Sequence, residues 1–239
     1  MDKIKKALYS LLEKYDVIFD PSVNLLPGWS FLKKKMDVND VPLLTWRSNR
    51  KFVELHKIVS GNIVEHICML RFCCLTDSNT DFVSLMYREF DLCEFIGQGK
   101  IYSLHATLTD ERGGNIILKL DNGVICSVEI GNQIPFDCKK IDRHEIIARR
   151  GVASDLVVDT QIPQQSIYMY TEKEATAYKD VDNELFGFGE EEIELIRSSF
   201  EFYRNMQLKE FYCRQHNHLS KIIDMAFISN KEHRKININ

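Results

Sequence analysis

Several motifs that mark common functional classes are missing from this sequence. Its seven cysteines are scattered and form no CxxC pair, which argues against a zinc ribbon or a thioredoxin-like site. There is no P-loop (GxxxxGK[ST]) to cradle nucleotide phosphates and no GxSxG elbow of a hydrolase. No run approaches the roughly 18 apolar residues that a membrane-spanning helix needs. A formal net charge of −4 gives no excess of cations, so we expect neither nucleic acid nor a membrane as partner.

The composition is that of an ordinary globular protein. The chain has 239 residues, 44% of them hydrophobic and 28% charged, which is enough to bury a sizeable core. The N-terminal segment is amphipathic and lacks the apolar core of a signal peptide. Several cysteines lie among apolar residues, as expected of buried thiols in a reducing compartment. We therefore predict a cytoplasmic protein with one domain over residues 1–239.

Hydrophobic periodicity predicts an α+β fold, with an open, mainly antiparallel sheet and helices packed on one face. Polar loops are expected at 48–51, 76–81 and 172–183. The predicted helices cover residues 3–15, 61–75, 190–203 and 208–227, and the helix at 61–75 is apolar almost all round. The predicted strands cover residues 16–19, 41–46, 83–90, 101–108, 116–120, 124–130, 144–149, 156–160 and 166–170.

The most regular stretch runs from residue 115 to 130, around the turn residues 121–123. A two-residue loop would place Leu118 opposite Ser127, whereas a three-residue loop pairs Leu118 with Cys126 and gathers the apolar side chains on one face. We therefore predict a three-residue loop whose glycine is left-handed. The apolar face would consist of Ile116, Leu118, Leu120, Val124, Cys126 and Val128.

Two short motifs resemble cofactor or metal sites but fit them poorly. Residues 97–99 read Gly-Gln-Gly, yet a dinucleotide-binding turn needs a helix after it, and the following residues alternate like a strand. The motif is interpreted as a connection between strands. Cys213 and His216 lie one helical turn apart, but His218 would point away from them, so a solvated or partly buried histidine is favoured. We expect no metal site and no cofactor-binding residue.

A candidate pocket is built from Glu65, His66 and Arg149. Charge on an apolar helix needs a partner or a pocket, although a polar pair facing solvent at a helix end would fit the same residues. Arg149 lies close in sequence to Arg143 and Arg150, and together they could bind an anion or simply solvate an edge of the sheet.

From residue 41 onward the order of elements resembles the C-terminal domain of the Gfo/Idh/MocA family of NAD(P)-dependent sugar and polyol oxidoreductases. Residues 121–131 (DNGVICSVEIG) look like that family's central hairpin, and residues 144–155 resemble the strand and turn that follow it. Residues 222–229 resemble the family's final helix. Residues 3–19 are similar to the end of its Rossmann domain, so 1–40 are interpreted as a remnant of that domain and 41–239 as the sheet-and-helix domain.

The departures from the family pattern lead to a prediction about activity. The family's glycine-rich phosphate turn and its Glu-Lys-Pro motif have no counterpart here. The family's helix with an acidic residue four positions before a catalytic His aligns with residues 61–75, which puts Glu65 at the acidic position and Met69 at the His position. Methionine cannot transfer a proton, so the resemblance implies no catalytic residue. A shifted alignment would place His66 at the site but break the acidic spacing.

Three functions remain open from the sequence. The first is a non-catalytic oligomerisation module, because in the family the open face of this sheet mediates oligomerisation and the six-residue apolar face could serve that purpose. The second is a subunit of a sugar or polyol dehydrogenase that uses NAD(P) held by a Rossmann domain in a partner chain. The third is a small-molecule-binding protein that uses the candidate pocket.

Overall fold

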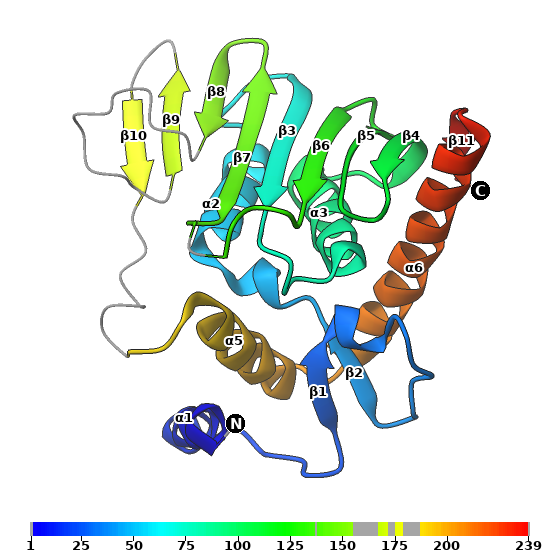
Figure 1. Cartoon of the computed structure of the whole chain (residues 1–239). Coiled ribbons are helices and arrows are strands. Elements are labelled where there is room, and N and C mark those ends of the chain that lie inside the picture. The colour runs from blue at the N-terminus through cyan, green and yellow to red at the C-terminus, as the bar shows by residue number, and fades with distance from the viewer. Residues whose placement is uncertain (1, 137, 155–166, 172–174, 179–186, 239) are drawn as a thin grey trace. The chain divides into compact units, whose positions relative to one another are not determined.

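The computed structural model describes residues 2–136, 138–154, 167–171, 175–178 and 187–238 (Figure 1). Its helices are α1 (Asp2–Lys14), α2 (Arg50–Ser60), α3 (Phe82–Gly97), α5 (Glu190–Arg204) and α6 (Leu208–Glu232), with short 3₁₀ turns η1 (Gly28–Phe31) and η2 (Thr45–Ser48). Its strands are β1 (Asn24–Pro27), β2 (Asp40–Leu43), β3 (Ile67–Leu75), β4 (Ile101–Thr109), β5 (Gly113–Leu120), β6 (Ile125–Gly131), β7 (Ile141–Ala148), β8 (Gly151–Ser154), β9 (Ile167–Thr171), β10 (Ala175–Tyr178) and β11 (Ile236–Asn237).

The chain divides into two compact units, each of which is built from two separate stretches of sequence. One comprises the described residues of 1–50 and 181–220, and the other those of 51–180 and 221–239. This division differs from the single domain predicted from the sequence, and its boundaries do not fall at residue 40. Helix α6 contributes residues to both units.

The first unit packs α5 against the η2 turn and against α1. Strands β1 and β2 pair in parallel, with Leu25 opposite Val41. The Ser198 hydroxyl of α5 donates to the Thr45 carbonyl (3.2 Å), and Asn49 Nδ2 donates to the Glu194 carboxylate (2.8 Å). These two contacts satisfy buried polar groups of a short irregular segment, as burial requires.

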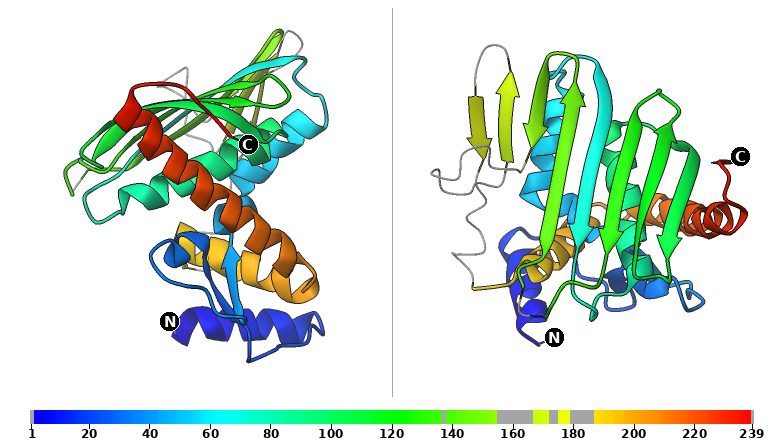
Figure 2. Two further views of the ribbon diagram at one scale, coloured as in Figure 1. Left: turned by 90° about the vertical axis from the view of Figure 1, so that its right-hand side faces the viewer. Right: turned by 45° about the horizontal axis from the view of Figure 1, so that its top comes forward.

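The second unit is a nine-stranded sheet with the order β10-β9-β8-β7-β3-β6-β5-β4-β11. All its neighbouring strands are antiparallel except β3 and β6, which run parallel. Figure 2 shows α2, α3 and the C-terminal half of α6 on one face of this sheet. The predicted fold class, an α+β protein with a mainly antiparallel sheet and helices on one face, is confirmed.

The central hairpin has the predicted register. Leu118 lies opposite Cys126 and Ile116 opposite Val128. The amide of Leu120 donates to the Val124 carbonyl (2.9 Å), and Gly123 has a φ of +91°. The three-residue loop with a left-handed glycine is therefore confirmed, because only that loop length gathers the apolar residues on one face.

The prediction of a helix at 61–75 is wrong, because residues 67–75 form β3 in the middle of the sheet. Leu70, Phe72 and Cys74 are buried at every second position, which is the period of a strand. A short apolar run bounded by turns fits a buried strand as well as a buried helix, and its length of nine residues favours a strand. The helix lies earlier, in α2, whose first two residues fall within the loop predicted at 48–51.

The prediction of a strand at 83–90 is also wrong, because this segment lies inside α3. Asp81 caps the helix by accepting a hydrogen bond from the Ser84 amide (3.1 Å), and Gln98 ends it in the left-handed region (φ +54°). Residues 97–99 therefore follow a helix and precede a strand, the reverse of a dinucleotide-binding turn.

Smaller differences concern the ends of the chain and the β9–β10 region. Residues 16–19 form no strand, and residues 175–178 form β10 where a loop was predicted. The strands predicted at 41–46, 101–108, 144–149 and 166–170 correspond to β2, β4, β7 and β9. The strand predicted at 156–160 lies outside the described residues.

Candidate functional site

The most concentrated chemistry in the second unit is a cluster of charged side chains between α3 and the sheet. Arg88 and Glu89 come from α3, Asp142 and His144 from β7, and Lys51 from the start of α2. Asp142 and His144 are two residues apart on a strand, so they face the same side of the sheet. Glu89 and His144 are fully buried, and the other three side chains are 10% to 12% exposed. The cluster is therefore shielded from solvent by the chain itself.

Asp142 is held by two cations. The Arg88 guanidinium donates to both its carboxylate oxygens, with Nη1 2.8 Å from Oδ1 and Nη2 3.0 Å from Oδ2. Lys51 Nζ donates to Oδ2 (3.0 Å) and to the Asp142 carbonyl (3.2 Å). Both cations also lie over the ring of Phe52, at 5.1 Å for the guanidinium carbon and 4.7 Å for Nζ. The bidentate geometry orients Arg88 tightly.

Glu89 joins Arg88 to His144. One carboxylate oxygen of Glu89 accepts from Arg88 Nη1 (3.0 Å), and the other lies 3.0 Å from His144 Nε2. The imidazole packs against Phe52 and Phe72, each ring centroid 4.7 Å away. Besides the imidazole, the cluster contains two cations, Lys51 and Arg88, and two carboxylates, Glu89 and Asp142.

The pKa values reflect this mutual pairing. Burial by itself would raise the pKa of Asp142, but the charges of Arg88 and Lys51 outweigh it and hold that pKa well below its usual range. Burial would likewise lower the pKa of Arg88, whereas Asp142 and Glu89 raise it above its usual value. Burial raises the pKa of the Cys74 thiol, which keeps the sulfur protonated.

Among the described residues, one group of side chains has donor atoms close enough to hold a metal ion. Cys74, Glu89 and Asp142 each offer an atom within 4.8 Å of the others. However, Nη1 of Arg88 lies 3.3 Å from the Cys74 sulfur, 3.0 Å from Glu89 and 2.8 Å from Asp142. A guanidinium nitrogen thus takes the position that a cation would need, and the protonated thiol is a poor ligand. The residues present do not fit a metal.

The cluster pairs its charges internally, and its Glu89 and His144 side chains are fully buried. It ties the start of α2 and the middle of α3 to β7. None of the residues predicted from the sequence belongs to this cluster, although the charges of Arg88 and Glu89 within the apolar segment 82–97 are a signal that could have revealed it.

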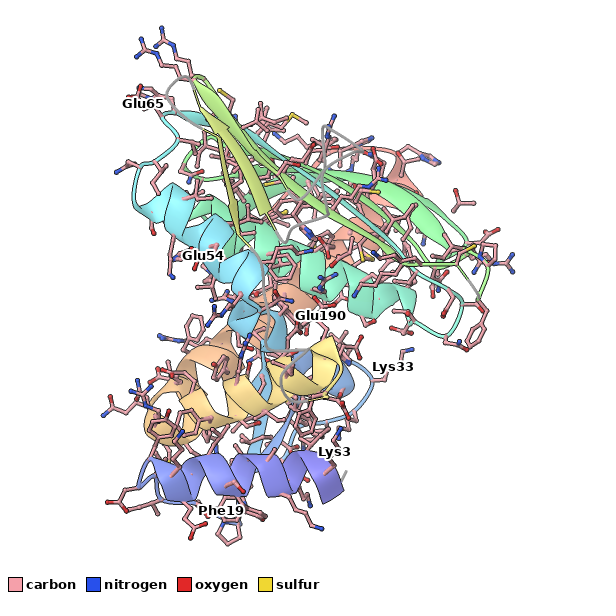
Figure 3. The ribbon with its side chains drawn as sticks, turned by 90° about the vertical axis from the view of Figure 1, so that its left-hand side faces the viewer. Lys3, Phe19, Lys33, Glu54, Glu65 and Glu190 are labelled. Atoms are coloured by element: carbon pink, nitrogen blue, oxygen red, sulfur yellow. The ribbon has the colours of Figure 1, made fainter. Side chains whose placement is uncertain are left out.

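The residues of the predicted pocket lie on a turn at the end of the sheet, where Figure 3 labels Glu65. The amide of Arg149 donates to the carbonyls of Glu65 (3.2 Å) and His66 (3.1 Å), so the main chain brings these residues together. Their side chains are exposed, and Glu65 lies 3.6 Å from Arg150 across the surface. The alternative of a solvent-facing polar pair describes these side chains better.

Met69 and the three residues of the rejected metal motif lie on a strand and on a helix, respectively. Met69 lies on β3, half-buried and on the face opposite Leu70, so the helix that would align it with a catalytic His is absent at that point. Cys213, His216 and His218 all lie on α6, and His216 is buried beside Phe31 with its pKa lowered by that burial. In the described part of the chain, the metal-capable group does not include these three residues.

The six-residue apolar face predicted for oligomerisation is the core of the second unit. All six side chains are at most 6% exposed, because α3 packs on this side of β5 and β6. These six side chains therefore form no exposed surface, because they are core residues. The opposite face of the sheet exposes Ile117 and Ile125, at 41% and 44%.

No family model and no curated protein matches this sequence. Solved structures do match. They include an oxidoreductase domain protein from Kribbella flavida (11% identity, TM-score 0.65) and a myo-inositol 2-dehydrogenase from Lactobacillus plantarum (13%, 0.61). A third is an inositol dehydrogenase homolog from Azotobacter vinelandii, solved with NADH and myo-inositol (8%, 0.63). The fold is that of these dehydrogenases.

The likeness extends over most of this chain but not over the whole of the solved ones. It covers 84%, 88% and 83% of this chain, and 66%, 67% and 64% of the three structures in the same order. At these identities the match concerns the fold and not the activity. In the described part of the chain, no helix combines the length and the apolar character needed to cross a bilayer.

Proposed function

We propose that this chain is an oxidoreductase-like sheet domain that acts by self-association rather than by catalysis of its own. The proposed partner is a second copy of the chain, seated on the face of the sheet that the helices leave open. The observation that carries the proposal is a row of apolar side chains on that face, near the end of the sheet at which β3 and β6 begin.

The apolar row crosses four neighbouring strands. Ile125 of β6 lies opposite Met69 of β3, which lies opposite Ile147 of β7, and this residue in turn lies opposite Val152 of β8. Each of these side chains is at least partly exposed. On β5, Lys119 lies opposite Ile125, and the exposed Ile117 lies two residues away, opposite Ser127. A contiguous apolar patch of this kind on a sheet face is typical of an interaction surface.

The charges beside the row favour a second copy as the occupant. Arg71 pairs with Glu145 on the neighbouring strand, and Cys73 lies between Glu129 and Arg143 in the register. Both signs of charge therefore alternate along the same face. A surface with both signs can complement itself across a two-fold axis, which is how most homodimers form.

The buried cluster supports a non-catalytic role. Every charge of Lys51, Arg88, Glu89 and Asp142 is matched within the cluster, and no ion or substrate is needed to complete it. The fold of a dehydrogenase is thus combined with an interior whose charges are used for packing.

Sedimentation velocity over a range of concentrations tests the proposal. The Ile125→Arg variant should shift the chain toward monomer, because it places a charge in the apolar row. Ile63→Arg is the matched control, since Ile63 has a similar exposure (48% against 44%) but lies on the turn before β3. A monomeric natural chain, or equal behaviour of the two variants, would refute the proposal.

The alternative function is that of a dehydrogenase subunit that uses NAD(P) held by a partner chain. It is favoured by the fold shared with inositol dehydrogenases. Calorimetry with NAD(H) and NADP(H), with and without a candidate Rossmann-domain partner, tests it. Cofactor binding that changes in affinity when this chain is added would support the alternative, and unchanged binding would exclude that partner.

A further inference from the structure

The outer edge of β4 is closed by the chain's own C-terminal segment. In its first half, β4 pairs with β11, so that Ile236 lies opposite Leu104 and Asn237 opposite Ser103. The amide of Ile238 then donates to the Tyr102 carbonyl (2.8 Å). An open edge strand is a template for another strand, and here a strand of only two residues covers it.

Side chains of α6 close the second half of the same edge. The Ala106 amide donates to Ser229 Oγ (3.0 Å), and the Leu108 amide donates to Asn230 Oδ1 (2.7 Å). These two oxygens take the place of the carbonyl oxygens that a neighbouring strand as long as β4 would supply. The outward-facing main chain of β4 is thereby satisfied along most of its length.

The segment 233–238, which we call the strap, is held by few contacts. It begins at His233, whose φ of +52° is unfavourable for a non-glycine residue. Ser229 Oγ donates to the Arg234 carbonyl (2.6 Å), which fixes the turn. Ile236 is its buried side chain, at 7% exposure, whereas residues 234, 235 and 237 are exposed. A strap with one apolar anchor can be displaced without disturbing the rest of the sheet.

An uncovered β4 edge would fit the same edge of a second copy. Release of the strap frees the first half of β4, since Ser229 and Asn230 still cover the amides of Ala106 and Leu108, and β4 stays paired with β5 on its inner side. When a strand pairs with its own copy across a two-fold axis, the two run antiparallel, and this is the orientation that β4 already has with both neighbours.

We propose that the strap is an autoinhibitory edge guard, and that its release lets two copies of this chain pair edge to edge through β4. This pairing uses the edge of the sheet and is independent of association through the open face. Removal of the strap therefore adds an association step that the natural chain lacks.

A chain that ends at Lys235 tests the proposal, compared with the natural chain by sedimentation velocity. The shortened chain should show an additional dimerisation at least tenfold tighter than any seen at this edge in the natural chain. Hydrogen exchange at the amide of Leu104, which lies opposite Ile236 of the strap, should slow as its concentration rises. The additional dimer should persist with Ile125→Arg present, which separates it from open-face association. Asn237→Ala, which keeps the main-chain pairing, is the control and should behave like the natural chain.

A folded shortened chain with the natural association behaviour would overturn the proposal. If the shortened chain does not fold, the full-length Ile236→Ser variant replaces it, because it loses only the apolar anchor. A synthetic peptide of residues 233–239 should dissociate the dimer of either variant, and the same peptide with Ile236→Pro should not. A dimer that the natural peptide leaves intact is not an edge dimer.

Discussion

Replacement of Arg88 by methionine is the sharpest test of the buried cluster. Methionine has a similar length but no charge, so the substitution leaves Asp142 and Glu89 buried without their shared cation. Removing one partner of a buried ion pair costs about 3–5 kcal/mol. Lys51 remains 3.0 Å from Asp142 and still compensates one carboxylate, which places the expected loss at the lower end, at about 3 kcal/mol.

The loss should appear in urea unfolding followed by far-UV circular dichroism, as a lower midpoint with an unchanged slope. Arg150→Met is the control, because its ion pair with Glu65 spans 3.6 Å and both side chains are more than half exposed. It should cost at most about 1 kcal/mol. Combining Arg88→Met with Asp142→Leu should recover part of the lost unfolding free energy, since the second substitution removes one of the two buried carboxylates that Arg88 neutralises. If Arg88→Met costs no more than Arg150→Met, the cluster is solvated and the reasoning fails.

Three further predictions concern acid stability, the central turn and metal binding. Because the pKa of Asp142 is depressed in the folded chain, its contribution to stability is present above the unfolded value of about 3.9 and disappears as pH falls through the lower folded value. Unfolding free energies measured from pH 7 to pH 3 should therefore fall less steeply near pH 3 in Asp142→Asn. Gly123→Ala should cost about 1 kcal/mol in urea unfolding, since its φ is +91° and no atom crowds it, whereas Gly113→Ala should cost nothing. Zinc should raise the melting temperature of Arg88→Ala but not of the natural chain, because only the variant frees the three donor atoms; equal shifts would contradict this.

The central hairpin shows what local sequence can predict. Strict alternation on both sides of residues 121–123 leaves one loop length that keeps a single apolar face, and the structure has that loop. The same reasoning could not say which way the face turns. Both faces of β5 and β6 carry isoleucines, and only the position of α3 determines that Leu118 and Cys126 are buried while Ile117 and Ile125 are exposed.

The helix and strand assignments at 61–97 show the limit of periodicity. The apolar run in β3 is too short to distinguish the period of a strand (2 residues) from that of a helix (3.6 residues). The residues on either side of it include no helix-capping signal that would decide between the two. Helix α3 did carry a cap at Asp81 and a left-handed end at Gln98, but its buried Arg88 and Glu89 disguised the apolar spacing. These charges are tolerated because Asp142 and His144, more than fifty residues away, lie opposite them.

The sequence alone determined the fold class, the register of the hairpin and the absence of the common nucleotide and hydrolase motifs, because each follows from neighbours in the chain. The tertiary structure alone decided which sheet face is open, which charges are paired and how the β4 edge is closed. These features depend on residues that are distant in sequence and meet only when burial brings them together, since the cost of burying a charge or an unpaired main-chain group depends on what lies opposite it.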